Sequence, residues 1–169
     1  AGVTRQRILV AATELFEDVG YGNTSLSDIV AHSHLSKGAF YYHFQSKESV
    51  AAALIKEADA ALAARFYGTM NAPSPTLENL IAATFGAAAL MHGDSRARIG
   101  FRLHLALDQI SHSGDLAFGR RRAEFIAAIA LAIADGDLDD DVDATELGHT
   151  LWTSILGTHL LETACHDDI

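Results

Sequence analysis

The apolar residues of this chain recur with a helical period in almost every segment, and this pattern constrains the fold more than any other feature. No alternating strand pattern and no repeat of 20–50 residues interrupts it. The first stripe is followed by Gly20, where a helix end favours a residue that tolerates positive φ. The sequence therefore predicts an all-α fold. The first stripe consists of Ile8, Leu9, Ala12, Leu15, Phe16 and Val19.

Two short helical patterns follow the first helix and are separated by the turn "AHSHL". Asn23 or Thr24 is placed to cap the first of them, and Ser36 is placed to cap the second. The second pattern fades at "FQ", after which Ser46 caps an alanine-rich helix that runs to about Met70. A long helix followed by two short helices and a tight turn predicts a helix-turn-helix.

The remaining chain contains four longer helical patterns. They come after "NAPSPT", which contains both prolines of the chain and is its clearest linker. We therefore expect a three-helix head, a connecting helix and a helical bundle. The four patterns cover residues 76–92, 95–111, 115–135 and 143–164.

The second short helix, within "LSKGAFYYHFQSKE", has more aromatic rings than one buried face can hold. Phe40 and Phe44 are four residues apart, so they share a face, which we expect to be buried. In a helix-turn-helix the second helix lies in the DNA major groove, where lysine and tyrosine side chains meet bases or phosphates. The residues that turn away from the buried face are Lys37, Gly38, Tyr41 and Tyr42.

Four further residues at the ends of these helices could contact the phosphate backbone. His43 and Lys47 lie near the end of the second short helix, and Thr24 and Ser25 lie near the start of the first. The charge distribution favours an anionic partner at this end of the chain. The net charge is −10 in total but only −1 over residues 1–57.

At these residues the sequence becomes similar to a known family. "TRQRILVAATELFEDVGYGNTSLSDIVAHSHLSKGAFYYHFQSKESVAAALI", residues 4–55, resembles the DNA-binding domain of the TetR family of transcriptional repressors. The resemblance implies a homodimer with two heads on a palindromic, double-stranded operator. The DNA-contacting positions of that family match Thr24, Ser25, Ser36, Lys37, Gly38, Tyr41, Tyr42, His43 and Lys47.

Two later segments, "TLENLIAATFGAAAL" and "RARIGFRLHLAL", resemble the γ-butyrolactone-receptor branch of that family. This resemblance implies a repressor released by a small diffusible effector, such as a butyrolactone- or furan-like signal. It also implies a helix-turn-helix domain at 1–45, a connecting helix at 46–70 and a ligand-binding and dimerisation domain at 71–169, with the last helix of the family absent. The branch has a tryptophan early in the 115–135 helix, whereas Trp152 is the only tryptophan here.

Helices of the larger domain offer an apolar interior with a few polar groups, as expected of a small-molecule cavity. The same residues equally describe an ordinary core with satisfied histidines. Arg98, Arg102 or the Arg120–Arg122 cluster could pair with a carboxylate on the ligand if one of them turned inward. The predicted ligand-binding residues are Thr84, Phe85, Phe101, His104, Leu105, Gln109, Phe125 and Trp152.

The last helix alternates small and large apolar residues. Gly148 and Gly157 lie among Leu147, Leu151 and Leu156, a face that could let two helices approach in a dimer. In the family resembled, the last two helices form a four-helix interface between subunits. We therefore expect a homodimer through the C-terminal helices.

Other functional classes find little support. The nine histidines include no third ligand at a convincing spacing, so no metal or other cofactor is predicted. No nucleophile elbow is present, and we expect no enzyme activity. The alternative that stays open is a ligand-independent helical DNA-binding protein.

The sequence also bears on where the protein acts. No run of 18 or more uncharged apolar residues occurs, so no membrane span is predicted. There is no signal-peptide pattern, and a single cysteine, Cys165, fits a reducing cytoplasm.

Overall fold

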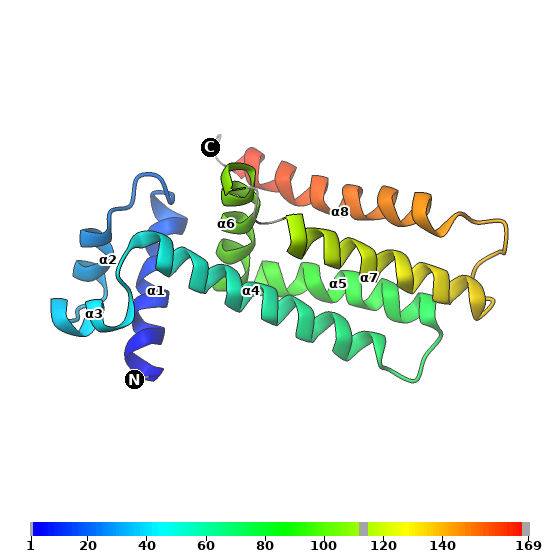
Figure 1. The fold of residues 1–169 in the computed structure, drawn as a ribbon, viewed down its shortest axis with the longest axis horizontal. Coiled ribbons are helices and arrows are strands. Elements are labelled where there is room, and N and C mark those ends of the chain that lie inside the picture. The colour runs from blue at the N-terminus through cyan, green and yellow to red at the C-terminus, as the bar shows by residue number, and fades with distance from the viewer. Residues whose placement is uncertain (1, 112–114, 167–169) are drawn as a thin grey trace. The chain divides into compact units, whose positions relative to one another are not determined.

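The computed structural model describes the backbone of residues 2–111 and 115–166 and the side chains of residues 2–107 and 119–158. Over this part the chain forms eight helices and no strand, which confirms the predicted all-α fold (Figure 1). Among these helices, none combines the length and the apolar character that a membrane span needs. The helices are α1 Gly2–Asp18, α2 Leu26–His32, α3 Lys37–His43, α4 Lys47–Met70, α5 Thr76–Gly93, α6 Ser95–Ser111, α7 Asp115–Ala134 and α8 Ala144–His166.

The N-cap of α2 is Ser25, where the sequence predicted Asn23 or Thr24. The Ser25 hydroxyl accepts the Asp28 N–H at 3.2 Å, and the Asp28 carboxylate accepts the Ser25 N–H at 2.8 Å. This reciprocal pair is a capping box. Thr24 does not serve as the cap because its hydroxyl turns inward and donates to the Gly20 carbonyl at 2.8 Å. Ser36 caps α3, as predicted.

Packing divides the chain into two units. Unit 1 comprises Ala1–Phe66 and Phe85–His112, and unit 2 comprises Tyr67–Thr84 and Ser113–Ile169. The boundaries fall inside α4 and α5, so each of these helices contributes to both units. These two units reflect packing contacts. The divisions predicted at residues 45 and 70 instead separate the segments expected to bind DNA, to connect, and to bind ligand.

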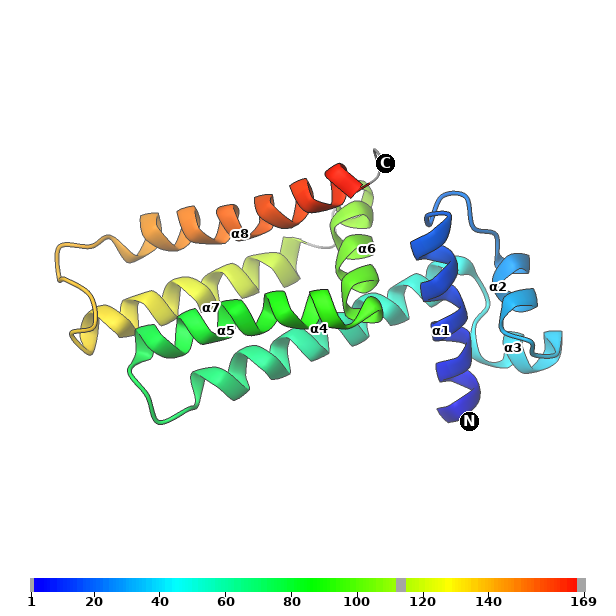
Figure 2. The same cartoon turned by 180° about the vertical axis from the view of Figure 1, so that it is seen from behind.

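In unit 1 a single apolar core joins the three-helix head to α4 and α6. Both views of the structure show α1 between the α2–α3 pair and α6 (Figures 1 and 2). Val19 was predicted on the buried stripe, but it is 49% exposed because α1 ends at Asp18. The core includes Ile8, Leu9, Phe16, Ile29, Phe40, Phe44, Val50, Leu54, Ile99 and Leu103.

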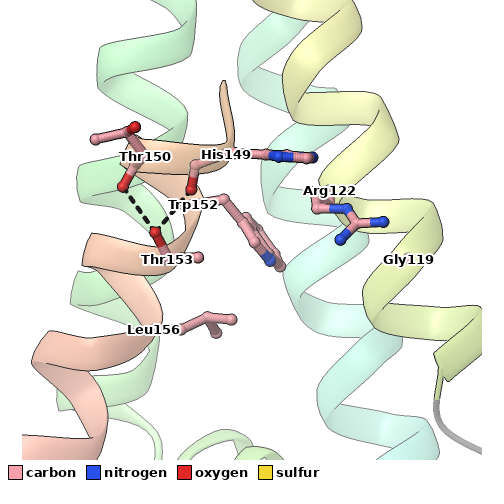
Figure 3. A pocket seen from close by; sticks show the side chains of 7 residues that line it. All are labelled: Gly119, Arg122, His149, Thr150, Trp152, Thr153 and Leu156. Atoms are coloured by element: carbon pink, nitrogen blue, oxygen red, sulfur yellow. Dashed lines mark hydrogen bonds between the residues drawn. The ribbon is translucent and has the colours of Figure 1, made fainter. Parts of the chain in front are cut away.

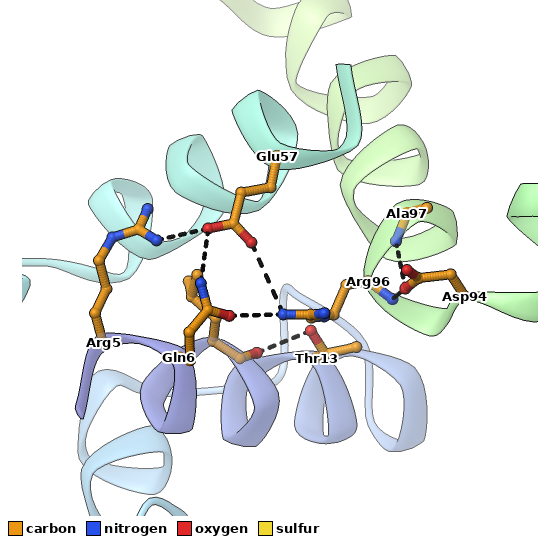
Figure 4. A network of polar contacts seen from close by, with 8 residues as sticks. Arg5, Gln6, Thr13, Glu57, Asp94, Arg96 and Ala97 are labelled. Carbon is orange, nitrogen blue, oxygen red and sulfur yellow. Dashed lines mark hydrogen bonds and ion pairs between the residues drawn. The ribbon is translucent and has the colours of Figure 1, made fainter. Parts of the chain in front are cut away.

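A polar network beside this core also connects α1, α4 and α6 (Figure 4). Arg5 of α1 donates to the Glu57 carboxylate of α4 at 2.5 Å. Arg96 of α6 donates to the Gln6 side chain at 2.6 Å and lies 4.0 Å from Glu57. Glu57 is therefore shared by arginines of two other helices. The head is fastened to α6 by charge as well as by apolar packing.

In unit 2, α7 and α8 run side by side in both views. They approach closely at Gly148, where an added Cβ would lie 2.5 Å from Cγ1 of Ile126. The sequence assigned Gly148 to a dimer face, but the structure uses it for packing within the chain. The Phe125 and Trp152 rings, with centroids 6.1 Å apart, join the same two helices.

Candidate functional site

The α3 helix presents two different faces. Phe40 is 0% exposed and Phe44 is 5% exposed, and their ring centroids lie 6.5 Å apart in the core of unit 1. Tyr42 is 79% exposed and Tyr41 is 41% exposed. The burial pattern predicted for this helix is therefore present, because two phenylalanines fix the orientation and leave the tyrosines outside.

The N-terminal end of α3 is open to solvent. Lys37 and Gly38 are both exposed, and a Cβ added at Gly38 would meet no atom within 4 Å. Ser36 is exposed, and its hydroxyl accepts the Ala39 N–H at 3.3 Å. At the other end of α3, His43 is half-buried and its ring meets the Tyr42 ring edge-on at 5.0 Å. Another molecule can approach the backbone closely at Gly38.

Lys47 occupies a more internal position than the sequence indicated. Its ammonium donates to the carbonyl oxygens of Tyr21 and Thr24, both at 2.8 Å. The same nitrogen lies 4.3 Å from the centroid of the Tyr21 ring. Lys47 thus fastens the start of α4 to the turn before α2. The sequence offered only a general signal for this, namely that carbonyls of a turn need donors.

Thr24 and Ser25, predicted together as phosphate contacts, lie in different environments. Thr24 is 2% exposed, so its side chain faces the protein interior rather than solvent. Its hydroxyl is turned toward the carbonyls of Gly20 and Leu15. Ser25 is exposed at the N-terminus of α2.

Five of the predicted ligand residues belong to unit 1. His104 is 7% exposed, and its Nδ1 lies 3.1 Å from the Asp59 carboxylate, as in an ordinary core with a satisfied histidine. Phe101 and Leu105 are half-buried on α6. Phe85 is 72% exposed, so it does not line an enclosed cavity as predicted. Gln109 lies outside the residues whose side chains are described.

The other three predicted ligand residues belong to unit 2. Thr84 is half-buried, and its hydroxyl donates to the Leu80 carbonyl at 2.9 Å within its own helix. Phe125 is buried, and its neighbour Trp152 is half-buried. Of the three, only Trp152 lines the pocket described next.

A groove of about 390 Å³ lies between α7 and α8 in unit 2 (Figure 3). Trp152 was predicted to bind a ligand, and Arg122 was named as a partner for a carboxylate. His149 was expected beside Trp152 in the interior of the larger domain, and the remaining lining residues were not predicted as ligand contacts. The spacing of the five α8 residues from His149 to Leu156 places them on one helix face, which could have identified them. The lining residues are Gly119, Arg122, His149, Thr150, Trp152, Thr153 and Leu156.

Metal binding has no candidate in the described part of the chain. No three histidine, cysteine, aspartate or glutamate side chains there are grouped so that they could hold an ion. His159 and His166, which are seven residues apart and could share a helix face, lie outside the residues whose side chains are described.

Comparison with known proteins points to DNA-binding regulators. The profile of a family described as "Bacterial regulatory proteins, tetR family" matches residues 8–54. The A-factor receptor protein of Streptomyces griseus is 33% identical over 102 residues, which cover 60% of this chain and 35% of that protein. The chain spans about a third of the length of the curated relatives that it matches.

Solved structures extend the similarity beyond the head. A γ-butyrolactone receptor described as an ArpA-like protein superposes with a TM-score of 0.81 at 32% identity, over 91% of this chain and 80% of that one. CprB from Streptomyces coelicolor, solved in complex with its biological operator sequence, gives a TM-score of 0.69 at 29% identity. That match covers 96% of this chain and 84% of CprB.

Proposed function

Because this chain belongs to the TetR family of bacterial regulatory proteins, we propose that it is a ligand-responsive transcriptional repressor. It binds a palindromic double-stranded operator as a homodimer and is released by a small diffusible effector of the butyrolactone or furan type. Family membership also supports the prediction that the protein is a regulator rather than an enzyme.

The observation that carries this proposal is the division of α3 into two faces. Phe40 and Phe44 are buried, while Lys37, Tyr41 and Tyr42 face solvent. A helix with such an exposed end suits the major groove, where its first residues meet base edges. Lysine reaches guanine acceptors or phosphates, and tyrosine hydroxyls reach either phosphate oxygens or bases. The open backbone at Gly38 lets the duplex come close.

The phosphate contacts are proposed from the ends of the short helices. Ser25 and Ser36 are exposed at two helix N-termini, where backbone N–H groups favour anions, and His43 lies at the end of α3. Thr24 and Lys47 act differently: they hold the turn before α2 in place. The Lys47 ammonium has three N–H groups and uses two on carbonyls, so the third can still reach a phosphate.

The effector and the homodimer are proposed from the relatives and from α8. The A-factor receptor and the γ-butyrolactone receptor are named for small signals that they receive. On α8, Leu151 is 39% exposed, and a Cβ added at Gly157 would meet no atom within 4 Å. This face remains available for a second copy, although Gly148 is not. A repressor of this kind acts in the cytoplasm, where the operator lies.

For the operator to be released, effector binding in the larger domain must change the position of the DNA-binding heads. We assign this step to α4, because it is one continuous helix from Lys47 to Met70 and contributes to both packing units. Its first part is fixed in the head by Val50 and Leu54, which are fully buried. An effector that favours one position of α4 would move the two recognition helices away from the one-turn spacing that a duplex demands.

The DNA-binding proposal is tested on an operator selected from a pool of random duplexes. Gel-shift titrations at two salt concentrations compare the wild type with Lys37→Ala and Tyr41→Ala. Each variant should bind the selected operator more weakly by about 1–3 kcal/mol, because each loses a base-directed contact. Lys56→Ala is the control, since Lys56 is an exposed lysine on α4. If Lys37→Ala and Tyr41→Ala bind as tightly as Lys56→Ala, α3 is not the reading helix.

A further inference from the structure

We propose that the groove between α7 and α8 is a binding site for a small planar molecule that carries a carboxylate. The described residues that line the groove all belong to unit 2 and come from two helices, α7 and α8. This inference goes beyond the proposed repressor function, because it concerns binding in the groove alone and does not depend on any contact with DNA.

The positive charge in the groove comes from Arg122. It is the last of three consecutive arginines on α7, and the other two lie near one carboxylate: Arg120 at 3.9 Å and Arg121 at 3.7 Å from Glu124. Arg122 is exposed, and within the part of the chain whose side chains are described its guanidinium makes no ion pair. In a chain of net charge −10, an arginine without a carboxylate partner is available to an external anion.

The other polar groups of the groove suit the same kind of ligand. Figure 3 shows His149 and Trp152 extending from α8 toward α7, from which Arg122 reaches into the same space. Among the lining residues whose side chains are described, none carries a carboxylate that would compete with an anion. The His149 ring can donate an N–H, and the guanidinium can grip a carboxylate through two parallel hydrogen bonds.

The apolar part of the groove favours a planar group next to the carboxylate. The Trp152 indole is half-buried and held against Phe125, which leaves it as a fixed flat wall. Leu156 adds an apolar side chain one turn further along α8. The volume of about 390 Å³ falls within the range of roughly 300–1,000 Å³ for small-molecule sites. The occupant is therefore a small molecule with an unsaturated or aromatic body.

The experiment uses trans-cinnamate as the probe and cinnamamide as its uncharged counterpart. Trp152 is the only tryptophan in the chain, so its emission and its single indole N–H resonance report directly on the groove. We expect cinnamate to shift that resonance and to bind about tenfold more tightly than cinnamamide, because only the acid makes charge-assisted hydrogen bonds. Equal binding of the two probes, or no shift of the resonance, would overturn the proposal.

Two arginine variants locate the anion site. Arg122→Gln should weaken cinnamate binding about tenfold and leave cinnamamide binding unchanged. Arg120→Gln removes the same charge from the neighbouring residue, which is 69% exposed at the side chain and does not line the groove, and should bind like the wild type. An equal loss in both variants would mean general charge attraction and would refute the site.

A second copy of the chain is the competing occupant. If the groove is covered by another molecule, the indole resonance will move with protein concentration before any probe is added, and cinnamate will not compete until the complex is diluted. That result would overturn the small-molecule assignment. No DNA is present in these measurements, so they are independent of whether the repressor proposal holds.

Discussion

The ammonium of Lys47 lies over the face of the Tyr21 ring, 4.3 Å from its centroid, while it also donates to the Tyr21 carbonyl at 2.8 Å. The Tyr21 ring in turn meets Phe16 of α1 edge-on, with centroids 5.2 Å apart. The first residue of α4 is thereby joined to the end of α1 and to the turn that leads into α2. The contacts of Lys47 therefore connect α4 to the turn before α2 and, through the Tyr21 ring, to α1.

We expect Lys47→Met to destabilise the protein by about 1–3 kcal/mol, because two hydrogen bonds and a cation–π contact are lost while the aliphatic stem is kept. Urea unfolding followed by circular dichroism measures the change. Lys56→Met is the matched control, because Lys56 is an exposed lysine of the same helix, and it should lie within about 0.5 kcal/mol of the wild type. Similar losses in both variants would refute the structural role of Lys47.

The α6 helix approaches α4 closely at Gly100. A Cβ there would lie 2.5 Å from the Leu54 carbonyl oxygen and 2.6 Å from Cβ of Ala58, so the helices would have to separate. We expect Gly100→Ala to cost about 1–3 kcal/mol in the free energy of unfolding, as overpacking does. Thermal unfolding measures the change.

Gly68→Ala is the control for this substitution. Gly68 also lies in a helix, but an added Cβ there meets no atom within 4 Å. The exchange should therefore stabilise the protein by up to about 1 kcal/mol, because alanine favours a helix more than glycine does. If both glycine variants shift stability in the same direction, the close contact of α6 with α4 is not present in solution.

The shared carboxylate of Glu57 predicts a salt-dependent contribution to stability. Its side chain is 32% exposed and its arginine partners are 36–40% exposed, so solvent screens the interaction. We expect Glu57→Gln to cost no more than about 1 kcal/mol at low salt and less at high salt. Chemical unfolding at two salt concentrations checks this. Asp140→Asn, in the exposed acidic loop, removes the same charge and should show neither effect.

The capping box at α2 predicts a dependence of stability on pH. Hydrogen bonds that the hydroxyl and the backbone N–H of Ser25 donate to the Asp28 carboxyl hold the pKa of that carboxyl below its usual value. Because the folded pKa is depressed, this contribution is present above the unfolded pKa and is lost as the pH falls through the folded pKa. Asp28→Asn should therefore be less stable than the wild type at neutral pH, and the difference should shrink in acid.

The measurement is a series of unfolding curves across that pH range for the wild type and Asp28→Asn. Asp18→Asn serves as the control, since Asp18 is an exposed carboxylate at the end of α1 that caps no helix N-terminus, and its difference from the wild type should not follow the same course. A constant difference between wild type and Asp28→Asn at every pH would contradict the capping role of the charged carboxylate.

Helix periodicity was enough to predict the number of helices and most of their ends, because turn and capping signals are local. The choice between two neighbouring N-cap candidates could not be made from the local sequence pattern. Thr24 and Ser25 both suit an N-cap, and Ser25 takes the position because a carbonyl of the preceding turn captures the Thr24 hydroxyl. The two faces of α3 were predictable, since Phe40 and Phe44, which have no polar group, are four residues apart and share a face.

The features that the sequence did not predict depend on which helices pack against each other in the folded protein. Periodicity showed an apolar face on α1 but not that Ile99 and Leu103 of α6 would lie against it. It placed Phe85 inside, although the structure leaves that ring exposed. The internal position of Lys47 likewise depends on where the turn places its carbonyls, and that placement arises only after the helices pack.

The shared core of α1 and α6 bears on how such regulators could be recombined. Consider a chimera that joins residues 1–66 to the effector domain of another protein. Its apolar core would lack Ile99 and Leu103 of α6, and Glu57 would lose its contact with Arg96. A transplant of DNA specificity would therefore need to include α6, or else confine the exchange to the exposed residues of α3.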